Sequence, residues 1–521
     1  MNVKVENKER IRMVLPVGLG PECLKEEWCL EILPRKSKVL TFWDTFEWGI
    51  WFGERVLFSC GNVYHLCARD NNGWLGPVQC EEEAVGRRRF WGEFETPSMR
   101  EILEGLLGLR GLAPVAEGIF GLRQCELRND MGKIVCRIEW TTVSTGEHEE
   151  DVLLRYCQVM PLLGYEFEST RVVELLTLRG ARLSGDGPLD ILLHHSNHLP
   201  QKYTLRPSFG LTRDTPAREA VSRVVRTVLA IATRNVPGII EDLDTEFLHD
   251  YRICLRKIRS VLSLVKDVFP REATHRLRRL LGELARETNR LRDLDVYLLA
   301  RDEYRGMLPP ELRKCLDGMF DDFSAERECE MRRTASRMQK RAHLRLIQEL
   351  EDFFRVDARH EHSPAADLPV GLLVYQCIYK RYKKIRKIAA GFGVETPDEM
   401  VHQLRIEGKK LRYLMEFFSE LIPREDTAEA QKLLRRLQGR LGDFNDASVQ
   451  QKSLLSYWNQ NKHGSEVAFG LGGLISILYH RQQQARERIK HELDEFCGGS
   501  TASAFKRSFR LPVSDPGTNA S

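Results

Sequence analysis

Residues 249–259 have the sequence HDYRICLRKIR, and residues 402–412 have the sequence HQLRIEGKKLR. Both match the pattern H-x-x-R-x-x-x-[RK]-K-x-R. Because successive residues of an α-helix turn by about 100°, the positions i, i+3, i+7 and i+10 fall within an arc of roughly 80° and span about 15 Å of helix. Each segment therefore predicts a helix that carries one histidine and three cations in a row.

These two rows differ from an ordinary exposed helix in the sign of their charges. An exposed helix usually alternates acidic and basic residues, so that side chains at i and i+4 attract each other. The rows contain cations only, so each must either face solvent or meet an anion from elsewhere. A solvated helix face is the alternative for a single row, and the duplication with identical spacing favours an anion-binding site.

The totals limit what kind of protein this is. A chain of 521 residues with 42% hydrophobic residues predicts two to four packed domains. The 79 Lys and Arg residues nearly balance the 75 Asp and Glu residues, so anion binding must come from local placement of charge. The 13 cysteines include no C-x-x-C pair, and no signal peptide or long apolar run is present. We therefore expect reduced thiols, a cytoplasmic location and no membrane segment.

The first part of the chain, residues 1–195, has the features of a strand-rich domain. Short apolar runs such as residues 39–43 alternate with turn clusters such as residues 71–73. A helical stretch over residues 98–109 interrupts the strands. We expect an α+β domain here.

The composition changes after residues 196–213, which are rich in Gly, Pro, Ser and His and predict a linker. Residues 214–497 consist of long amphipathic runs with Leu, Ile and Val at helical spacing, which predict an all-α domain. Residues 498–521 are rich in Ser, Gly and Pro, and we expect a disordered tail.

The helical part contains an internal repeat, over residues 214–354 and 370–497. Each half has a long helix, an acidic turn, the helix with the basic row, a loop with proline and a further amphipathic helix. A repeat of this length with several helices per unit predicts two helical bundles related by a pseudo-twofold axis. Such symmetry could bring the two basic rows to face each other across a cleft.

The helical part resembles the CHAD domain, a family named for conserved histidines in an α-helical domain. The residues that carry the resemblance are EFLHDYRICLRKIR from Glu246, VHQLRIEGKKLRY from Val401, and the Arg-Leu-x-Asp motifs at Arg290 and Arg440. The resemblance implies two four-helix bundles around a basic cleft. It also implies binding of inorganic polyphosphate and association with polyphosphate granules.

Polyphosphate suits such rows because it offers a receptor little except a chain of negative charges. A protein can meet it only with cations and hydrogen-bond donors at suitable spacing. Histidines donate more hydrogen bonds when protonated, so binding could tighten as the pH falls. The residues expected to bind polyphosphate are His249, Arg252, Arg256, Lys257 and Arg259 in the first row, His402, Arg405, Lys409, Lys410 and Arg412 in the second row, and Lys380 and Lys384 in a third basic run.

The N-terminal part resembles a degenerate CYTH domain, which implies an antiparallel β tunnel or barrel. The resemblance rests on FWDTFE at residues 42–47 and LCAR at residues 66–69. CYTH enzymes hydrolyse triphosphates and need an opening strand with Glu-x-Glu-x-Lys. Alternate residues of that strand point inward, and their carboxylates hold Mg²⁺ or Mn²⁺.

The opening strand of this chain departs from that signature. Glu6, Lys8, Arg10 and Arg12 would share one face, so one carboxylate stands where two are needed. We therefore expect no catalytic residue, no metal ligand and no resident cofactor, and a need for Mg²⁺ or Mn²⁺ only if this domain is active.

Three functional hypotheses follow. The first is a non-catalytic polyphosphate receptor, and the alternative is a metal-dependent inorganic triphosphatase or polyphosphate-processing enzyme that uses the CYTH-like domain. The third is a nucleic-acid binder that uses the same rows. The chain has no helix-turn-helix, RRM or zinc-finger signature and few aromatic residues beside the rows. We therefore expect no specific nucleic acid partner.

Overall fold

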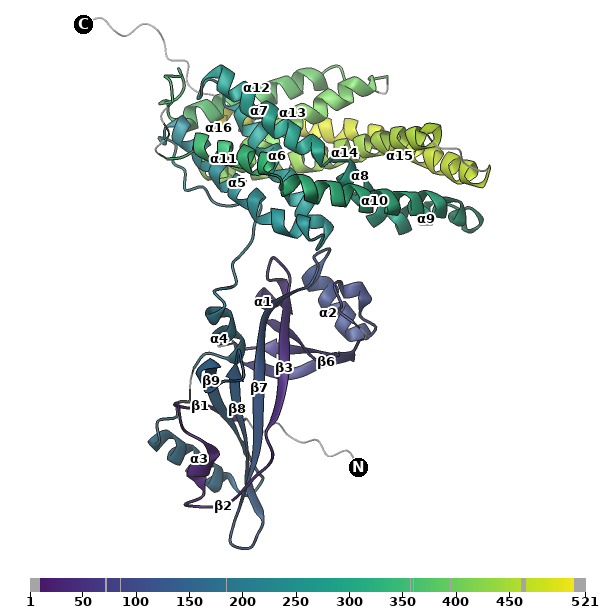
Figure 1. Cartoon of the computed structure of the whole chain (residues 1–521). Helices are drawn as coiled ribbons and strands as arrows, with labels where there is room; N and C mark the ends of the chain where they lie inside the picture. The colour runs from purple at the N-terminus through teal and green to yellow at the C-terminus, as the bar shows by residue number, and fades with distance from the viewer. Residues whose placement is uncertain are drawn as a thin grey trace, which may run out of the picture. The chain divides into compact units, whose positions relative to one another are not determined.

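The computed structural model describes residues 10–70, 73–84, 86–183, 185–356, 358, 360–393, 395–460 and 465–509 (Figure 1). The chain divides into two compact units, Met1–Tyr203 and Thr204–Ser521. The division falls inside the segment 196–213 that the sequence predicts as a linker. The residues expected as the opening strand, from Glu6 to Glu9, lie outside the described residues.

The first unit is built on one antiparallel sheet with the strand order β1-β9-β8-β7-β3-β4-β5-β6, and β2 pairs with the far end of β7. This confirms the predicted antiparallel α+β fold. The described strands form an open half-barrel, and the Arg12 side chain of β1 reaches β6, where Nη2 donates to the Leu75 carbonyl at 3.0 Å. The strands are β1 Ile11–Val14, β2 Cys29–Ile32, β3 Lys36–Asp44, β4 Arg55–Cys60, β5 Val63–Arg69, β6 Leu75–Glu83, β7 Ala113–Arg128, β8 Ile134–Ser144 and β9 Val152–Pro161.

Four helices cover this sheet and bury its apolar side chains. Alternation along β8 places Ile138 in a core with α3 (Glu166–Leu178), whereas Val143 belongs to a core with α4 (Pro188–His195). A third core surrounds α2 (Pro97–Leu107), which confirms the helix predicted over residues 98–109. The remaining helix is the single turn α1 (Gly49–Phe52).

The second unit is entirely helical where the structure describes it, apart from its connecting loops, and the order of its helices repeats (Figure 1). The first half begins with the contacting helices α5 and α6, and the second half begins with α12 and α13. The helices are α5 Ala217–Ile240, α6 Thr245–Leu264, α7 Arg271–Glu287, α8 Asn289–Leu299, α9 Arg301–Met307, α10 Asp317–Met338, α11 Arg341–Phe353, α12 Val370–Ala389, α13 Asp398–Phe417, α14 Arg424–Gln460, α15 Ser465–Cys497 and α16 Gly499–Phe509.

The two halves of the helical unit share a core. Tyr304, Phe320 and Phe323 from the first half form one apolar cluster with Leu454 and Leu474 from the second half. Burial of apolar and aromatic side chains makes the main favourable contribution to the free energy of folding. The halves therefore fold as one body and hold α6 and α13 in a fixed relation.

The predicted disordered tail is wrong for its first residues, because α16 covers Gly499–Phe509. Phe505 stacks on Tyr382 of α12 with ring centroids 3.9 Å apart, and Phe509 contacts Tyr375 at 5.4 Å. Apolar side chains four residues apart share a helix face, and this pair is buried. The high content of Ser and Gly hides this short apolar stripe. Residues 510–521 lie outside the described residues.

The last residues of the predicted linker pack on the helical unit. The Glu420 carboxylate accepts hydrogen bonds from the Ser208 hydroxyl at 2.6 Å and from the backbone N–H groups of Phe209 and Leu211 at 2.6 and 2.7 Å. This segment is therefore fixed where it joins α5. No described helix has both the length and the apolarity needed to cross a membrane.

Candidate functional site

The two basic rows lie on neighbouring helices, because α6 contacts α13. The Asp244 carboxylate starts α6 by accepting N–H hydrogen bonds from Glu246 at 2.9 Å and Phe247 at 3.2 Å. Burial lowers the pKa of Arg405 and Lys409 on α13, and the guanidinium group of Arg256 on α6 lowers both further. The structure therefore brings cations of both rows close together, as the repeat predicts.

Lys409 is the centre of this group. Burial first, and then the guanidinium groups of Arg405, Arg256 and Arg412, lower the pKa of Lys409 to about 8. No hydrogen bond or ion pair within the described chain neutralises its ammonium group, and the same holds for the exposed side chain of Arg256. These four side chains form what we call the cation cluster.

The first arginine of each row is held in place by the helix that packs beside it. Arg252 donates to the Ala285 carbonyl at 2.8 Å and the Thr288 hydroxyl at 2.7 Å, where α7 gives way to α8. A third bond reaches the Asn289 side chain at 2.8 Å. Burial, followed by the charge of Arg256, lowers the pKa of Arg252 to about 10. Arg252 therefore has a fixed orientation, with two of its five donors left over.

The second row is held by α14. Arg405 lies 3.8 Å from the Asp446 carboxylate, and the Nδ1 atom of His402 lies 3.3 Å from the Asn445 side-chain oxygen. The repeats differ here because α14 is continuous, whereas α7 and α8 meet at Thr288.

The row ends differ in their surroundings. Arg259 on α6 is exposed, and burial followed by the nearby Arg278 and Arg286 lowers its pKa. Arg412 on α13 instead donates to the Glu416 carboxylate at 3.2 Å. The first row therefore continues into a cationic surface on α7, and the second row ends beside a carboxylate.

Lys257 and Lys410 were expected in the site, and each leaves its helix on another side than the rest of its own row. They occupy position i+8, which lies about 80° from the histidine in the direction opposite to the rest of the row. Lys257 is 7% exposed and donates to the Leu205 carbonyl. Lys410 donates to Glu407 at 3.0 Å.

Glu407 also removes Lys384 from the group of available cations. Its carboxylate is 2% exposed and accepts from Lys384 at 3.0 Å and from Arg381 at 2.7 Å, besides Lys410. Burial alone would raise the pKa of Glu407, but these hydrogen bonds outweigh burial and lower it to about 2. Arg381 and Lys384 therefore fasten α12 to α13, and the same carboxylate holds Lys410 on α13 itself. Lys380 is exposed on α12, and no described residue pairs with its ammonium group.

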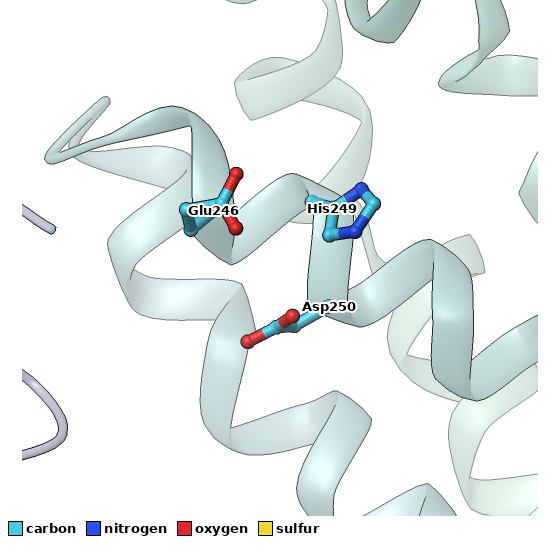
Figure 2. Close-up of side chains that lie close together, drawn as sticks. All are labelled: Glu246, His249 and Asp250. Atoms are coloured by element: carbon cyan, nitrogen blue, oxygen red, sulfur yellow. The ribbon is translucent and has the colours of Figure 1, made fainter. Parts of the chain in front are cut away.

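One group of side chains in the first row could in principle hold a metal ion. The ligand atoms of Glu246, His249 and Asp250 lie within 4.8 Å of one another. Figure 2 shows that the three side chains leave α6 in different directions. Glu246 also lies 3.9 Å from the Arg292 guanidinium group. A second group on α15 contains Glu492, which lies 3.0 Å from Arg436. Nearby arginines compete with a cation in both places.

In the first unit, the described cations of the opening strand are already paired. Arg10 lies 3.9 Å from Glu139 and donates to Gln158 at 3.4 Å. Arg12 lies 3.2 Å from Asp70. These two cations therefore already have partners within the unit.

Sequence reasoning missed Glu407 and Arg381 as a unit, along with Asp446 and the cations of α7. Glu407 lies inside the second row segment, but a glutamate on a charged helix usually faces solvent. Nothing in the sequence shows that three cations converge on it. Arg278 and Arg286 belong to a visible run of arginines on α7, and this run is the one signal that could have extended the first row.

Comparison with known proteins gives a family match for the helical unit. The family model of the CHAD domain matches residues 223–455. Two uncharacterized proteins of Mycobacterium tuberculosis, from strains CDC 1551 / Oshkosh and ATCC 25618 / H37Rv, are each 25% identical over 285 residues, which are 54% of this chain and 52% of the relative. The chain thus spans about half the length of the curated relatives it matches.

Three solved structures are similar to parts of the chain. The CHAD domain from the plant Ricinus communis has 24% identity and a TM-score of 0.48, and the match covers 55% of this chain and 95% of that one. PptA from Streptomyces chartreusis has 15% identity and a TM-score of 0.41, with 53% and 99% covered. A putative adenylyl cyclase from Hippeastrum, described as having a dominant triphosphatase activity, has 15% identity and a TM-score of 0.25, with 36% and 96% covered.

Proposed function

The helical unit contains a CHAD domain, and we propose that it binds inorganic polyphosphate along the paired basic rows without hydrolysing it. The ligand contacts are proposed for the two histidines and for the row cations at positions i+3, i+7 and i+10. Lys380 is proposed to extend this surface. Lys384 and Lys410 are left out because Glu407 holds their ammonium groups, and Lys257 is left out because it leaves α6 on another side than the rest of the first row.

One observation carries the proposal, namely the cation cluster of Lys409 with Arg256, Arg405 and Arg412. Like charges that lower one another's pKa cost folding free energy. A bound polyanion would offset that cost and provide oxygens for the free donors. A linear polyanion also matches two rows that run along helices, because each row extends about 15 Å.

The resemblance supports the choice of polyphosphate among polyanions, because the CHAD family binds it. A cytoplasmic location and association with polyphosphate granules remain predictions that rest on the sequence and the resemblance. Nucleic acid should compete only weakly, through its phosphate charge.

Two adjacent lysines provide a matched test. Lys409→Met removes an ammonium group that no described residue neutralises, and Lys410→Met removes one that Glu407 already holds. Both lose one positive charge from the same helix. Loss of a charge-assisted hydrogen bond costs about 1.5–3 kcal/mol, so Lys409→Met should weaken polyphosphate binding about tenfold or more.

Calorimetric titration of the full chain measures both variants, and thermal unfolding verifies that each is folded. Lys410→Met should change the affinity less than about threefold, since an exposed or already paired charge contributes little. Equal losses in the two variants would mean that net charge, and not the cation cluster, binds the ligand.

A further inference from the structure

A cavity of about 210 Å³ lies beside the C-terminal turn of α13. Residues 205–207 and Phe209 form one wall, and side chains of α6, α13 and α14 form the others. The contacts of Glu420 with Phe209 and Leu211 hold the first wall in place. The cavity therefore lies within the helical unit and between segments that are fixed to each other.

One side of the cavity carries the cations Lys257, Arg412 and Arg435, together with the Glu416 carboxylate, to which Arg412 donates at 3.2 Å. Lys257 is 7% exposed, and burial first, followed by the charges of Arg206 and Arg412, lowers its pKa despite the nearby Glu416. Its ammonium group has one described acceptor, the Leu205 carbonyl, and so retains two of its three donors. Arg435 of α14 is exposed at the cavity and has no described partner.

The other side of the cavity is apolar. Leu205, Phe209, Met415 and Leu434 all line it. A purely inorganic phosphate chain gains nothing from such a surface, because it has no apolar part to bury. The planar guanidinium groups of the lining arginines can instead stack on an aromatic ring.

Arg412 connects the cavity to the basic rows. Its guanidinium group lines the cavity and also lowers the pKa of Lys409 in the cation cluster. A ligand could therefore place one end in the cavity and extend its charged end towards Lys409. The cavity is smaller than the roughly 300–1,000 Å³ that enclose a whole drug-sized ligand, so it has room for a ring and not for the phosphates as well.

We infer that this cavity binds the base of a nucleoside di- or triphosphate whose phosphates reach the cations Lys257, Arg412 and Lys409. A nucleotide combines a planar, mostly apolar ring with a short polyanion, which are the two features that the lining requires. The site overlaps the proposed polyphosphate path at its charged end and differs from it by the apolar wall, which the rows lack. Nucleotides and polyphosphate would compete where the two paths meet, at Arg412 and Lys409.

The test compares ATP with inorganic tripolyphosphate, both without divalent metal, in calorimetric titrations of the full chain. Tripolyphosphate carries more charge per molecule, so electrostatics alone would make it the tighter ligand. Burial of the base should reverse that order and make ATP at least about tenfold tighter. Tripolyphosphate that binds as tightly as ATP, or no binding of ATP, would overturn the inference.

A variant that fills the cavity gives an independent readout. Ser419 lines the cavity and is exposed, so Ser419→Trp should block the ring without removing a charge. Its affinity for ATP should fall to that for tripolyphosphate, and tripolyphosphate binding should change less than about twofold. The control is Ser336→Trp, at an exposed serine of α10 that does not line the cavity.

An unchanged ratio of the two affinities in Ser419→Trp would place the base elsewhere and refute the site. The comparison of Lys409→Met with Lys410→Met tests polyphosphate binding, and because Lys409 serves the phosphates of both ligands, the cavity site is judged by the ratio of the affinities for ATP and tripolyphosphate. If the polyphosphate test fails but ATP still binds more tightly than tripolyphosphate, the cavity site stands. If the polyphosphate test succeeds but ATP shows no such preference, the cavity site alone is refuted.

Discussion

At the scale of single residues, Lys409 shows that the proposed binding site lowers the stability of the unliganded protein. Its pKa of about 8 lies well below the ordinary 10.5 because burial and three guanidinium groups disfavour its charge. Between these two pH values the unfolded chain therefore holds more protons at this position than the folded chain does. The folded state is penalised below pH 8, and the penalty disappears as the pH rises towards 10.5.

We predict that Lys409→Met stabilises the unliganded protein at pH 7 while it weakens polyphosphate binding. Removal of this partly desolvated, unpaired charge should increase the free energy of unfolding by about 1 kcal/mol. That increase should raise the melting temperature of the helical unit by about 2–4 °C. The difference between the variant and the wild type should shrink as the pH rises from 8 towards 10. Calorimetric melting at a series of pH values measures this, and a variant that melts lower than the wild type at pH 7 would show that Lys409 is instead a stabilising residue.

The helical spacing of the motif predicted part of the candidate site and missed the rest. The spacing of histidine, i+3, i+7 and i+10 predicted one row on each helix, and the structure brings Arg256 of one row close to Lys409 and Arg405 of the other. The lysine at i+8 belongs to the same motif but leaves the helix on another side. Leu205, the partner of Lys257, comes from tertiary packing, whereas Glu407, the partner of Lys410, lies three residues earlier on the same helix at a position that the motif leaves open.

At the scale of elements, Glu407 joins α12 to α13 and so positions the second row. It is a buried carboxylate that accepts hydrogen bonds from Arg381, Lys384 and Lys410. Loss of one member of a buried ionic group leaves the others unpaired and costs about 3–5 kcal/mol. We therefore predict that Glu407→Gln destabilises the helical unit by about that amount, measured by urea unfolding.

The control for this change is Glu399→Gln, which removes an exposed carboxylate near the start of the same helix. It should cost less than about 0.5 kcal/mol. The pKa of Glu407 is lowered to about 2 from 4.5, so its stabilising effect is complete above pH 4.5 and is lost as the pH falls towards 2. Equal stabilities of the two variants at pH 7 would mean that Glu407 does not fasten the helices.

Element boundaries depended on packing more than on local pattern. The sequence predicted the two long row helices, and they are present as α6 and α13. It did not predict α16, whose apolar face is short and lies among Ser, Gly and Ala. Nor did it distinguish the continuous α14 from its interrupted counterpart, because the break at Thr288 is stabilised by Arg252 from another helix.

At the scale of the whole molecule, the chain combines a unit in which Arg10 and Arg12 lie beside carboxylates with a unit whose cation cluster includes Arg256 and Lys409, neither of which has a described acidic partner. The face of the sheet with Arg12 also carries Val14, which packs against the core of Phe120 and Tyr156. This apolar filling and the pairing of Arg10 and Arg12 do not suit hydrolysis of a triphosphate. We predict no release of phosphate from tripolyphosphate above a protein-free blank with Mg²⁺ or Mn²⁺.

A colorimetric phosphate assay on the full chain measures this prediction, with metal-free samples as the control. Release that needs the metal and is abolished by Glu6→Gln would instead establish the triphosphatase alternative. The α+β class was predictable from alternating strands and turn clusters, and the antiparallel sheet was implied by the resemblance to the CYTH domain. The pairing of the opening-strand cations was not, because Asp70 and Glu139 are distant in sequence.

The most direct test of the account is the salt dependence of polyphosphate binding to the wild type and to Arg256→Gln/Lys409→Met. Each phosphate charge neutralised by the protein adds about 0.7 to the slope of log affinity against log salt for a single strand. The wild type should bind with a steep negative slope, and the double variant should bind much more weakly with a slope reduced by about 1.4. Identical affinity and slope in the two proteins would mean that the paired rows are solvated helix faces, and the central claim would fail.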